Sequence, residues 1–186
     1  YPPGSLWIGT FHSMFARLLR RHADLIGMTE NYSIYDRDDS LSVVKAIFKQ
    51  LPKATEMAPK TVLNRISQAK NAMVSPQEAA GLEHFDATFV SIYEQYEREL
   101  YNNNALDFDD LLLKPLQLFA ENPEVLDNYR QRFQYILIDE YQDINKGQYV
   151  LTKLISQDSQ LLVIGDPDQS IYGFRGSDKK YFDLFT

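Results

Sequence analysis

Several features that would assign the chain to a familiar class are missing from its 186 residues. It contains no cysteine, which rules out disulfides and thiolate metal sites and fits a reducing compartment. No apolar run approaches the roughly 20 residues that a membrane-spanning helix needs, and no secretory signal pattern is present. We therefore expect a cytoplasmic protein without a membrane partner.

Basic residues are also in short supply. The chain has 19 Lys and Arg against 26 Asp and Glu, which gives a net charge of −7. This balance argues against a wholly basic nucleic-acid coat protein, but it allows a local basic face because steering depends on where charges lie. The hydrophobic content of 44% is ordinary for a globular domain, and the length predicts one or two domains.

The phosphate-cradling stretch Gly-x-x-x-x-Gly-Lys-[Ser/Thr] does not occur anywhere in the sequence. The chain begins at Tyr1 without an initiator Met, which predicts a piece of a longer protein or a processed product.

The most informative stretch is Tyr135–Asp143, an apolar run of four that ends abruptly in Asp139 and Glu140. The run predicts a strand buried on both faces, as in parallel sheets. Ligands bind just beyond the carboxyl ends of such strands. There Asp139 can hold a hard cation such as Mg²⁺, and Glu140 can orient or deprotonate a water. The pattern indicates half of an NTPase site; the alternative is a strand that ends in solvated acids.

A second apolar run, residues 161–164, leads into a glycine-rich stretch at residues 165–176. Glycines allow the backbone to approach a ligand closely. Three polar side chains there can meet a nucleotide phosphate, its metal or its water: Asp166, Asp168 and Gln169. Tyr172 and Phe174, followed by Arg175, can stack on single-stranded bases, each stack being worth roughly 1–3 kcal/mol. Core packing is the alternative, and we favour it for Ile171.

The rest of the pattern is mainly helical. Residues 6–11 are a strand candidate, and Ser13 is a good N-cap for a helix over residues 14–22. The arginines of this helix form either a solvated face or a phosphate-facing patch: Arg17, Arg20 and Arg21. Further helices are predicted at residues 40–51, 61–72, 85–101, 124–132 and 146–155, and two more are predicted to start at Ser75 and at Asp107. A helical block between strands of one parallel sheet indicates an insertion into an α/β domain.

Four motifs occur in order: residues 10–13 (Thr-Phe-His-Ser), 107–112 (Asp-Phe-Asp-Asp-Leu-Leu), 138–143 (Ile-Asp-Glu-Tyr-Gln-Asp) and 165–176. Together they resemble the Rep/UvrD/PcrA-type superfamily 1 DNA helicases over nearly the whole chain. The last two motifs are highly specific and the first two are supportive. One departure is Phe174, where the family usually has Trp.

The resemblance implies an α/β fold: a partial RecA-like (P-loop NTPase) parallel sheet with a large all-helical insertion. Residues 1–13 and 133–186 would belong to the ATPase subdomain 1A, and residues 14–132 to the insertion 1B, which helps contact duplex DNA. The phosphate-binding loop would lie upstream, and a second RecA-like domain downstream. The chain would then be a central fragment of the motor.

The implied activity is that of an ATP-dependent DNA helicase, which couples Mg-ATP hydrolysis to translocation on single-stranded DNA and to unwinding at duplex junctions. By resemblance, Asp139 would hold Mg²⁺, Glu140 would activate the attacking water, and Gln169 would sense the γ-phosphate. By the same resemblance, Tyr172 and Phe174 would contact the single strand, and Thr10 and His12 would lie near the DNA backbone. Arg175 would tie the nucleotide site to the DNA.

Two other functions stay open. The chain could be a DNA-binding module without chemistry, and we expect the fragment alone to be inactive. A metal nuclease would use four acids: Asp107, Asp109, Asp139 and Glu140. We disfavour it because such sites need convergent carboxylates, whereas these motifs place the pairs on different elements.

Overall fold

The computed structural model describes residues 6–51, 57–166, 168, 181 and 184. The chain divides into two compact units, Tyr1–Lys114 and Pro115–Thr186. The division falls inside helix α6 (Asp110–Glu121). Among the described residues, no helix combines the length and the apolar character needed to cross a membrane. The subdomain boundaries expected from the resemblance stay a prediction.

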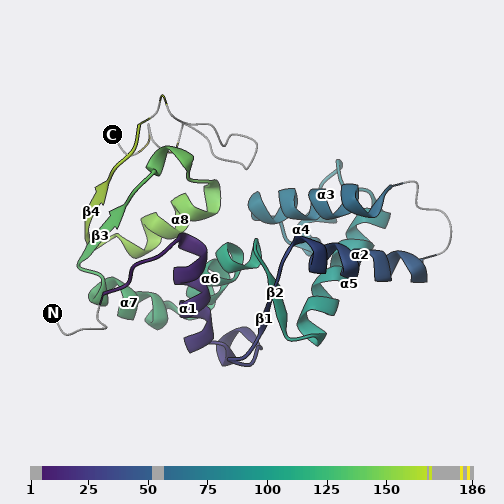
Figure 1. Ribbon diagram of the computed structural model, residues 1–186, viewed down its shortest axis with the longest axis horizontal. Helices are drawn as coiled ribbons and strands as arrows, with labels where there is room; N and C mark the ends of the chain where they lie inside the picture. Colours follow the sequence, from purple (N-terminus) through teal and green to yellow (C-terminus); the bar gives the residue numbers. More distant parts are fainter. Residues whose placement is uncertain (1–5, 52–56, 167, 169–180, 182–183, 185–186) are drawn as a thin grey trace. The chain divides into compact units, whose positions relative to one another are not determined.

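Five helices account for most of unit 1 (Figure 1): α1 (Phe11–Arg21), α2 (Arg37–Gln50), α3 (Pro59–Asn71), α4 (Pro76–Ala79) and α5 (Ala87–Asn102), with a short 3-10 turn η1 (Asp24–Ile26) after α1. Local capping chemistry explains where two of them begin. The Asp36 carboxylate accepts hydrogen bonds from the first turn of α2, and Ser75 with Glu78 forms a capping box at α4. The helices predicted in this region are confirmed, with ends shifted by a few residues.

Helices α2, α3 and α5 supply the core of the helical part of unit 1. Their apolar stripes recur at three- and four-residue spacing, which is how an amphipathic helix buries one face. The buried side chains include Val44, Ile47, Val62, Leu63, Ile66, Phe89, Ile92, Tyr93 and Tyr96.

A two-stranded parallel sheet lies within the segment that was predicted to be wholly helical. Strand β1 (Ser33–Tyr35) pairs with β2 (Ala105–Asp107), and Ile34 is the register partner of Leu106. The prediction was wrong here because strands of three residues are too short to show an alternating pattern. Asp107 consequently ends a strand, and α6 starts only at Asp110.

The start of the described chain also differs from the prediction. Residues 6–10 form no strand, and α1 begins at Phe11. The N-cap is Thr10, whose side chain accepts a hydrogen bond from the Ser13 backbone N–H at 3.3 Å. Ser13, expected to cap the helix, lies in its first turn, where its Oγ donates to the Thr10 carbonyl oxygen at 2.9 Å.

Unit 2 follows a strand–helix–strand order. After α7 (Pro123–Arg132) come β3 (Tyr135–Ile138), a 3-10 turn η2 (Tyr141–Asp143), α8 (Lys146–Ile155) and β4 (Gln160–Val163). β3 and β4 pair in parallel, with α8 as the connection between them (Figure 1). These strands and helices confirm the predicted elements. The mixture of helices with short parallel sheets is compatible with the expected α/β fold.

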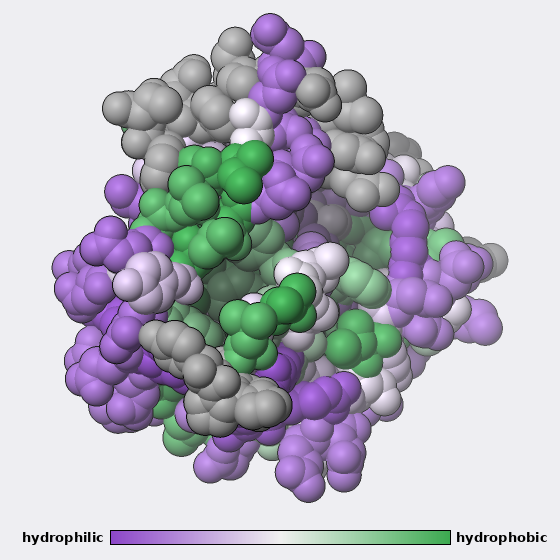
Figure 2. All heavy atoms as spheres, turned by 60° about the vertical axis from the view of Figure 1, so that its left-hand side comes forward, coloured by the Kyte–Doolittle hydropathy of each residue, from purple (hydrophilic) through white to green (hydrophobic). Residues whose placement is uncertain are grey.

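The paired strands β3 and β4 are not buried on both faces, contrary to the prediction. Side chains alternate along each strand, so Ile138 is buried while its neighbour Leu137 is 68% exposed. Leu162, the register partner of Leu137, is 54% exposed. Apolar surface is visible on the side that comes forward in Figure 2. The described residues therefore cover one face of this sheet and leave the other open.

Candidate active site and nucleic-acid interface

The parallel strands β3 and β4 bring polar residues together at their carboxyl ends, which we call the strand edge. Asp139 and Glu140 follow the last residue of β3, and Asp166 follows β4 after Ile164 and Gly165. The ladder continues past the strand ends, because the Ile164 N–H donates to the Ile138 carbonyl at 2.8 Å and the Tyr141 N–H donates to the Ile164 carbonyl at 2.9 Å. The carboxyl ends of β3 and β4 thus lie next to each other in unit 2.

Glu140 has an unusual backbone. Its φ of 52° lies in the left-handed region, which a residue with a side chain adopts at a cost of about 1–3 kcal/mol. The preceding Asp139 supports this turn, since its Oδ1 accepts a hydrogen bond from the Glu140 N–H at 3.0 Å. Strain of this kind clusters at functional sites. The turn directs the chain out of the strand immediately at the paired carboxylates.

Gln142 links the two strand ends. It is 3% exposed. Its Nε2 donates to Oε2 of Glu140 at 2.6 Å, and its Oε1 accepts from the Asp166 backbone N–H at 3.1 Å. Sequence reasoning quoted Gln142 as part of a motif but gave it no role. The available signal was its amide, which can donate and accept at once and therefore can join two loops.

The residues at this edge fit a magnesium ion. Asp139 is exposed, and its Oδ1 accepts the backbone hydrogen bond described above. Mg²⁺ binds through one or two carboxylates and completes its shell with waters and substrate phosphates. No group of three or more His, Asp or Glu side chains that could hold a metal occurs in the described part of the chain. Asp139 would therefore share the ion with water and nucleotide.

The loop after β4 is described only at its start. The Asp168 backbone N–H donates to Oδ1 of Asp166 at 3.0 Å. The other predicted site residues of this loop lie outside the described residues: Gln169, Tyr172, Phe174 and Arg175.

Thr10 and His12, which were predicted to contact the DNA backbone, lie at the start of α1 in unit 1. Thr10 is exposed, whereas His12 is half-buried and its ring centroid lies 5.6 Å from that of Phe108. Burial lowers the pKa of His12, so the imidazole is neutral at pH 7 and offers a hydrogen bond rather than a charge. Phe108 is 52% exposed. Sequence reasoning quoted Phe108 as part of a motif but gave it no role, although an aromatic residue between acids was a usable signal.

Two of the acids near Phe108 in the chain, Asp107 and Asp110, contact one buried lysine. Lys70 on α3 is fully buried, and its Nζ lies 2.8 Å from Oδ2 of Asp107, 2.8 Å from Oδ1 of Asp110 and 2.7 Å from Oε1 of Glu97. The Tyr96 hydroxyl also donates to Oδ2 of Asp107, at 2.9 Å. Asp107 and Asp110 further accept each other's backbone N–H. We call Lys70, Tyr96, Glu97, Asp107 and Asp110 the Lys70 cluster.

The Lys70 cluster contains three acids and one cation, which explains its electrostatics. Burial alone would lower the pKa of Lys70, but the surrounding carboxylates raise it well above its ordinary value. Burial and the charge of Asp107 raise the pKa of Asp110 to about 7. Burial opposes ionisation of Asp107, yet Lys70 holds its pKa below the ordinary range. Together these residues form a buried ion-pair network.

The same network weakens the nuclease interpretation. Asp107 is committed to Lys70 and Tyr96, and Asp109 accepts a hydrogen bond from Nδ2 of Asn71 at 2.8 Å. A carboxylate whose charge is neutralised by a buried ammonium is a poor ligand for a catalytic cation.

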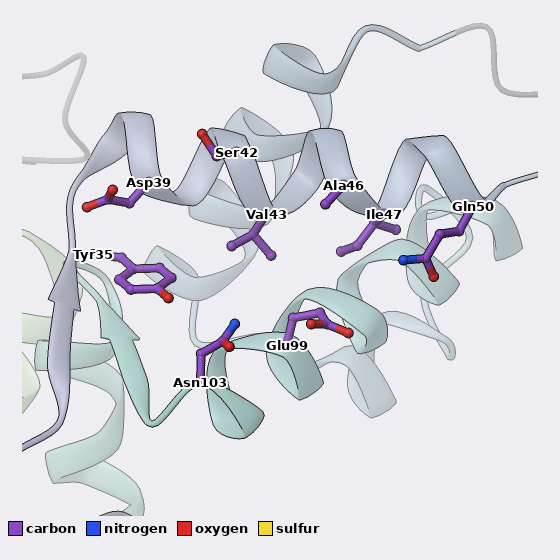
Figure 3. A pocket seen from close by; sticks show the side chains of 9 residues that line it. All are labelled: Tyr35, Asp39, Ser42, Val43, Ala46, Ile47, Gln50, Glu99 and Asn103. Carbon is purple, nitrogen blue, oxygen red and sulfur yellow. The ribbon is translucent and has the colours of Figure 1, made fainter.

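A separate cavity of about 340 Å³ lies between α2 and α5 (Figure 3). Val43 and Ile47 form its apolar part, and the carboxylates of Asp39 and Glu99 lie on its walls. Negative charge there disfavours a nucleotide phosphate. The cavity contains none of the predicted site residues, so the strand edge of unit 2 stays the candidate nucleotide site.

The strand edge places the chain in a broad structural class, that of α/β proteins with a candidate ligand site at the carboxyl end of a parallel strand pair. Comparison with known families then identifies the family of the chain. The model of the UvrD/REP helicase N-terminal domain matches residues 4–186, and the chain belongs to that family. The resemblance inferred from the four motifs is confirmed.

Individual relatives agree with the family match. The chain is 45% identical over 184 residues to the ATP-dependent DNA helicase PcrA of Bacillus subtilis (strain 168), covering 95% of this chain and 25% of the relative. It is 44% identical over 177 residues to the protein of the same name from Staphylococcus aureus (strain Mu50), with 93% and 24% covered. The chain thus spans about a quarter of the length of these curated relatives.

Proposed function

We propose that the chain is part of an ATP-dependent DNA helicase, in which Mg-ATP hydrolysis drives translocation on single-stranded DNA and unwinding at duplex junctions. The observation that carries the proposal is the strand edge of unit 2. There Glu140 follows directly on Asp139 and is joined through Gln142 to the loop after β4. The names of the relatives support the same activity.

Each residue of the strand edge has a task in phosphoryl transfer. Asp139 is suited to hold Mg²⁺, which neutralises charge on the nucleotide phosphates when it is bound. Glu140 accepts a proton from the attacking water and orients it. Gln142 fixes the Glu140 carboxylate through the 2.6 Å hydrogen bond. Gln169 is proposed, from the resemblance, to sense the γ-phosphate.

The DNA side of the proposal uses aromatic rings and a helix start. Tyr172 and Phe174 stack on single-stranded bases, and Arg175 ties the nucleotide site to the DNA. Thr10 and His12 contact the DNA backbone. Phe108 is a suitable addition, because exposed aromatic rings are how proteins grip unstacked bases and its ring lies beside that of His12.

The architecture proposed with this function has a RecA-like subdomain 1A at residues 1–13 and 133–186 and an insertion subdomain 1B at residues 14–132. The pairing of β3 with β4 supports a parallel sheet in the first of these. The remaining partners are the phosphate-binding loop and the second RecA-like domain of the motor. We expect the protein to work in the cytoplasm, and we expect this chain alone to be inactive.

ATP hydrolysis by the complete parent protein, with and without single-stranded DNA, tests the proposal. We expect DNA to stimulate turnover and the Glu140→Gln variant to abolish it, since the amide cannot accept a proton. Absence of turnover in the parent would contradict the motor. The matched control is Glu99→Gln, which makes the same change on α5 in unit 1 and should leave turnover intact.

A binding module without chemistry is the second candidate. The observation that favours this function is the neutral His12 beside the exposed Phe108. These two rings can contact DNA without a bound nucleotide. DNA binding by the parent without ATP turnover would support this function.

A further inference from the structure

Two arginines of α1 share one aromatic ring. The guanidinium carbon of Arg17 lies 4.4 Å from the ring centroid of Trp7, and that of Arg21 lies 5.0 Å from the same ring. Both arginines are exposed, and Trp7 is half-buried. We call these three residues the Trp7 clamp.

The neighbouring Arg20 is engaged differently. Its guanidinium lies over the Tyr32 ring at 4.3 Å, and its Nη1 donates to the backbone carbonyl of Glu30 at 2.6 Å. Arg20 therefore has a structural partner for its N–H groups, and we leave it out of the clamp.

The Trp7 clamp is electrostatically unusual. Arg17 and Arg21 are four residues apart on one helix, where like charges repel each other. The chain has more acids than bases, yet within residues 6–51 and 57–166 neither arginine forms an ion pair with a carboxylate. Two cations held together without a counter-charge are stabilised by an anion that binds both.

Stacking leaves the arginines ready for such an anion. The face of a guanidinium packs on the indole, while its N–H edge stays available for hydrogen bonds. The planar fork of arginine matches the two oxygens of a phosphate. The aromatic platform also fixes both side chains, so less conformational freedom is lost when a ligand binds.

We propose that Trp7, Arg17 and Arg21 form a binding site for the phosphodiester backbone of DNA. This inference rests on the proposed helicase function, because that function brings a polyanion to α1. Of the two alternatives for the arginines, a solvated face or a phosphate-facing patch, the proposal adopts the patch for two of the three arginines.

The clamp is separate from the contact expected at His12. Helical rotation of 100° per residue places Arg17 about 140° and Arg21 about 180° around α1 from His12. The nine residues between His12 and Arg21 correspond to about 13 Å along the axis. The clamp therefore holds different phosphates from those near His12, either farther along the same strand or on a duplex arm.

The test is DNA binding by the complete parent protein as a function of salt, with the double variant Arg17→Gln, Arg21→Gln. Two probes are used: a single-stranded oligonucleotide, and a duplex with a single-stranded tail. Each phosphate contact contributes about 0.7 to the slope of log affinity against log salt on single strands and about 0.9 on duplex DNA. We expect the variant to lose about 1.4 to 1.8 from this slope.

The two probes identify the source of the phosphates. A reduced slope on both indicates the single strand, and a reduced slope on the tailed duplex alone indicates the duplex arm. Unchanged slopes on both probes would overturn the proposal. The matched control is Lys45→Gln, Lys49→Gln, which removes two exposed charges with the same spacing on α2. An equal loss of slope in this control would also overturn it, because the effect would then follow net charge alone.

Geometry is tested by Arg17→Lys, Arg21→Lys, which keeps both charges but removes the planar forks. We expect weaker binding than in the parent, and binding equal to that of the parent would refute the clamp.

ATP turnover separates this inference from the proposed function. At saturating DNA the glutamine variant should turn over ATP at the parental rate and need more DNA for half-maximal stimulation. A parent without turnover would refute the motor, while the slopes would still decide the clamp.

Discussion

Replacing Lys70 with methionine is the sharpest test of how unit 1 is held together. Methionine keeps most of the side-chain volume but removes the one cation of the Lys70 cluster. Asp107 and Asp110 would then be buried without a counter-charge. Removal of one partner from a buried ion pair typically costs about 3–5 kcal/mol. This is a large part of the roughly 5–15 kcal/mol that stabilises a domain.

Amide hydrogen exchange in the complete parent protein measures the effect locally. The exchange of α3, α5 and β2 should accelerate by about two to four orders of magnitude, because exchange from buried elements follows the local free energy of opening. The exposed Lys60 lies on the same helix, so Lys60→Met is the control and should change exchange less than threefold.

A triple variant checks whether uncompensated buried charge causes the loss of protection. Adding Asp107→Asn and Asp110→Asn to Lys70→Met removes the two most deeply buried of the three uncompensated charges. It should recover part of the lost protection because neutral buried groups are far less costly than ionised ones. If Lys70→Met accelerates exchange less than tenfold, the three ion pairs do not stabilise unit 1 and the reasoning fails.

Three further predictions follow from the described contacts. The pKa of Asp110 is about 7 in the folded protein against an ordinary value of 3.8. The folded state therefore binds a proton that the unfolded state has lost, and the melting temperature of the protein should fall as pH rises from about 4 to 7. Asp110→Asn should flatten this pH dependence, and an unchanged dependence in the variant would contradict the prediction. Gln142→Leu should lower kcat for ATP roughly tenfold or more by freeing Glu140, with DNA affinity unchanged, and a parental kcat would exclude the positioning role. Phe108→Ala should weaken single-strand binding by about 1–3 kcal/mol, and Phe108→Tyr should retain it, as fluorescence titration can show.

Local signals allowed much of the fold to be predicted from sequence. Asp36 and Ser75 mark helix starts because their side chains accept backbone hydrogen bonds within the next three residues. The apolar run before Asp139 marks β3 because strand and carboxylates are contiguous. The match of β3 with β4 followed from two such runs separated by one helical pattern. Each of these features is complete within a short stretch of chain.

Long-range features could not be predicted in the same way. Lys70 meets Asp107 and Asp110 across 37 and 40 residues, and a single lysine in a helical pattern gives no sign of its partners. The pairing of β1 with β2 joins segments that are still farther apart, since Ser33 pairs with Ala105, and each strand is only three residues long. The exposure of Leu137 depends on what covers the sheet, which the strand's own residues do not encode.

The left-handed backbone at Glu140 sets stability against activity at a single position. A glycine there would adopt a φ of 52° without steric cost. Glu140→Gly should therefore make the turn after β3 easier to form, while it removes the carboxylate that the proposed chemistry needs. Selection for a more stable protein and selection for a faster one would favour different residues at position 140. Stabilising substitutions in this family are consequently safer when chosen away from the end of β3.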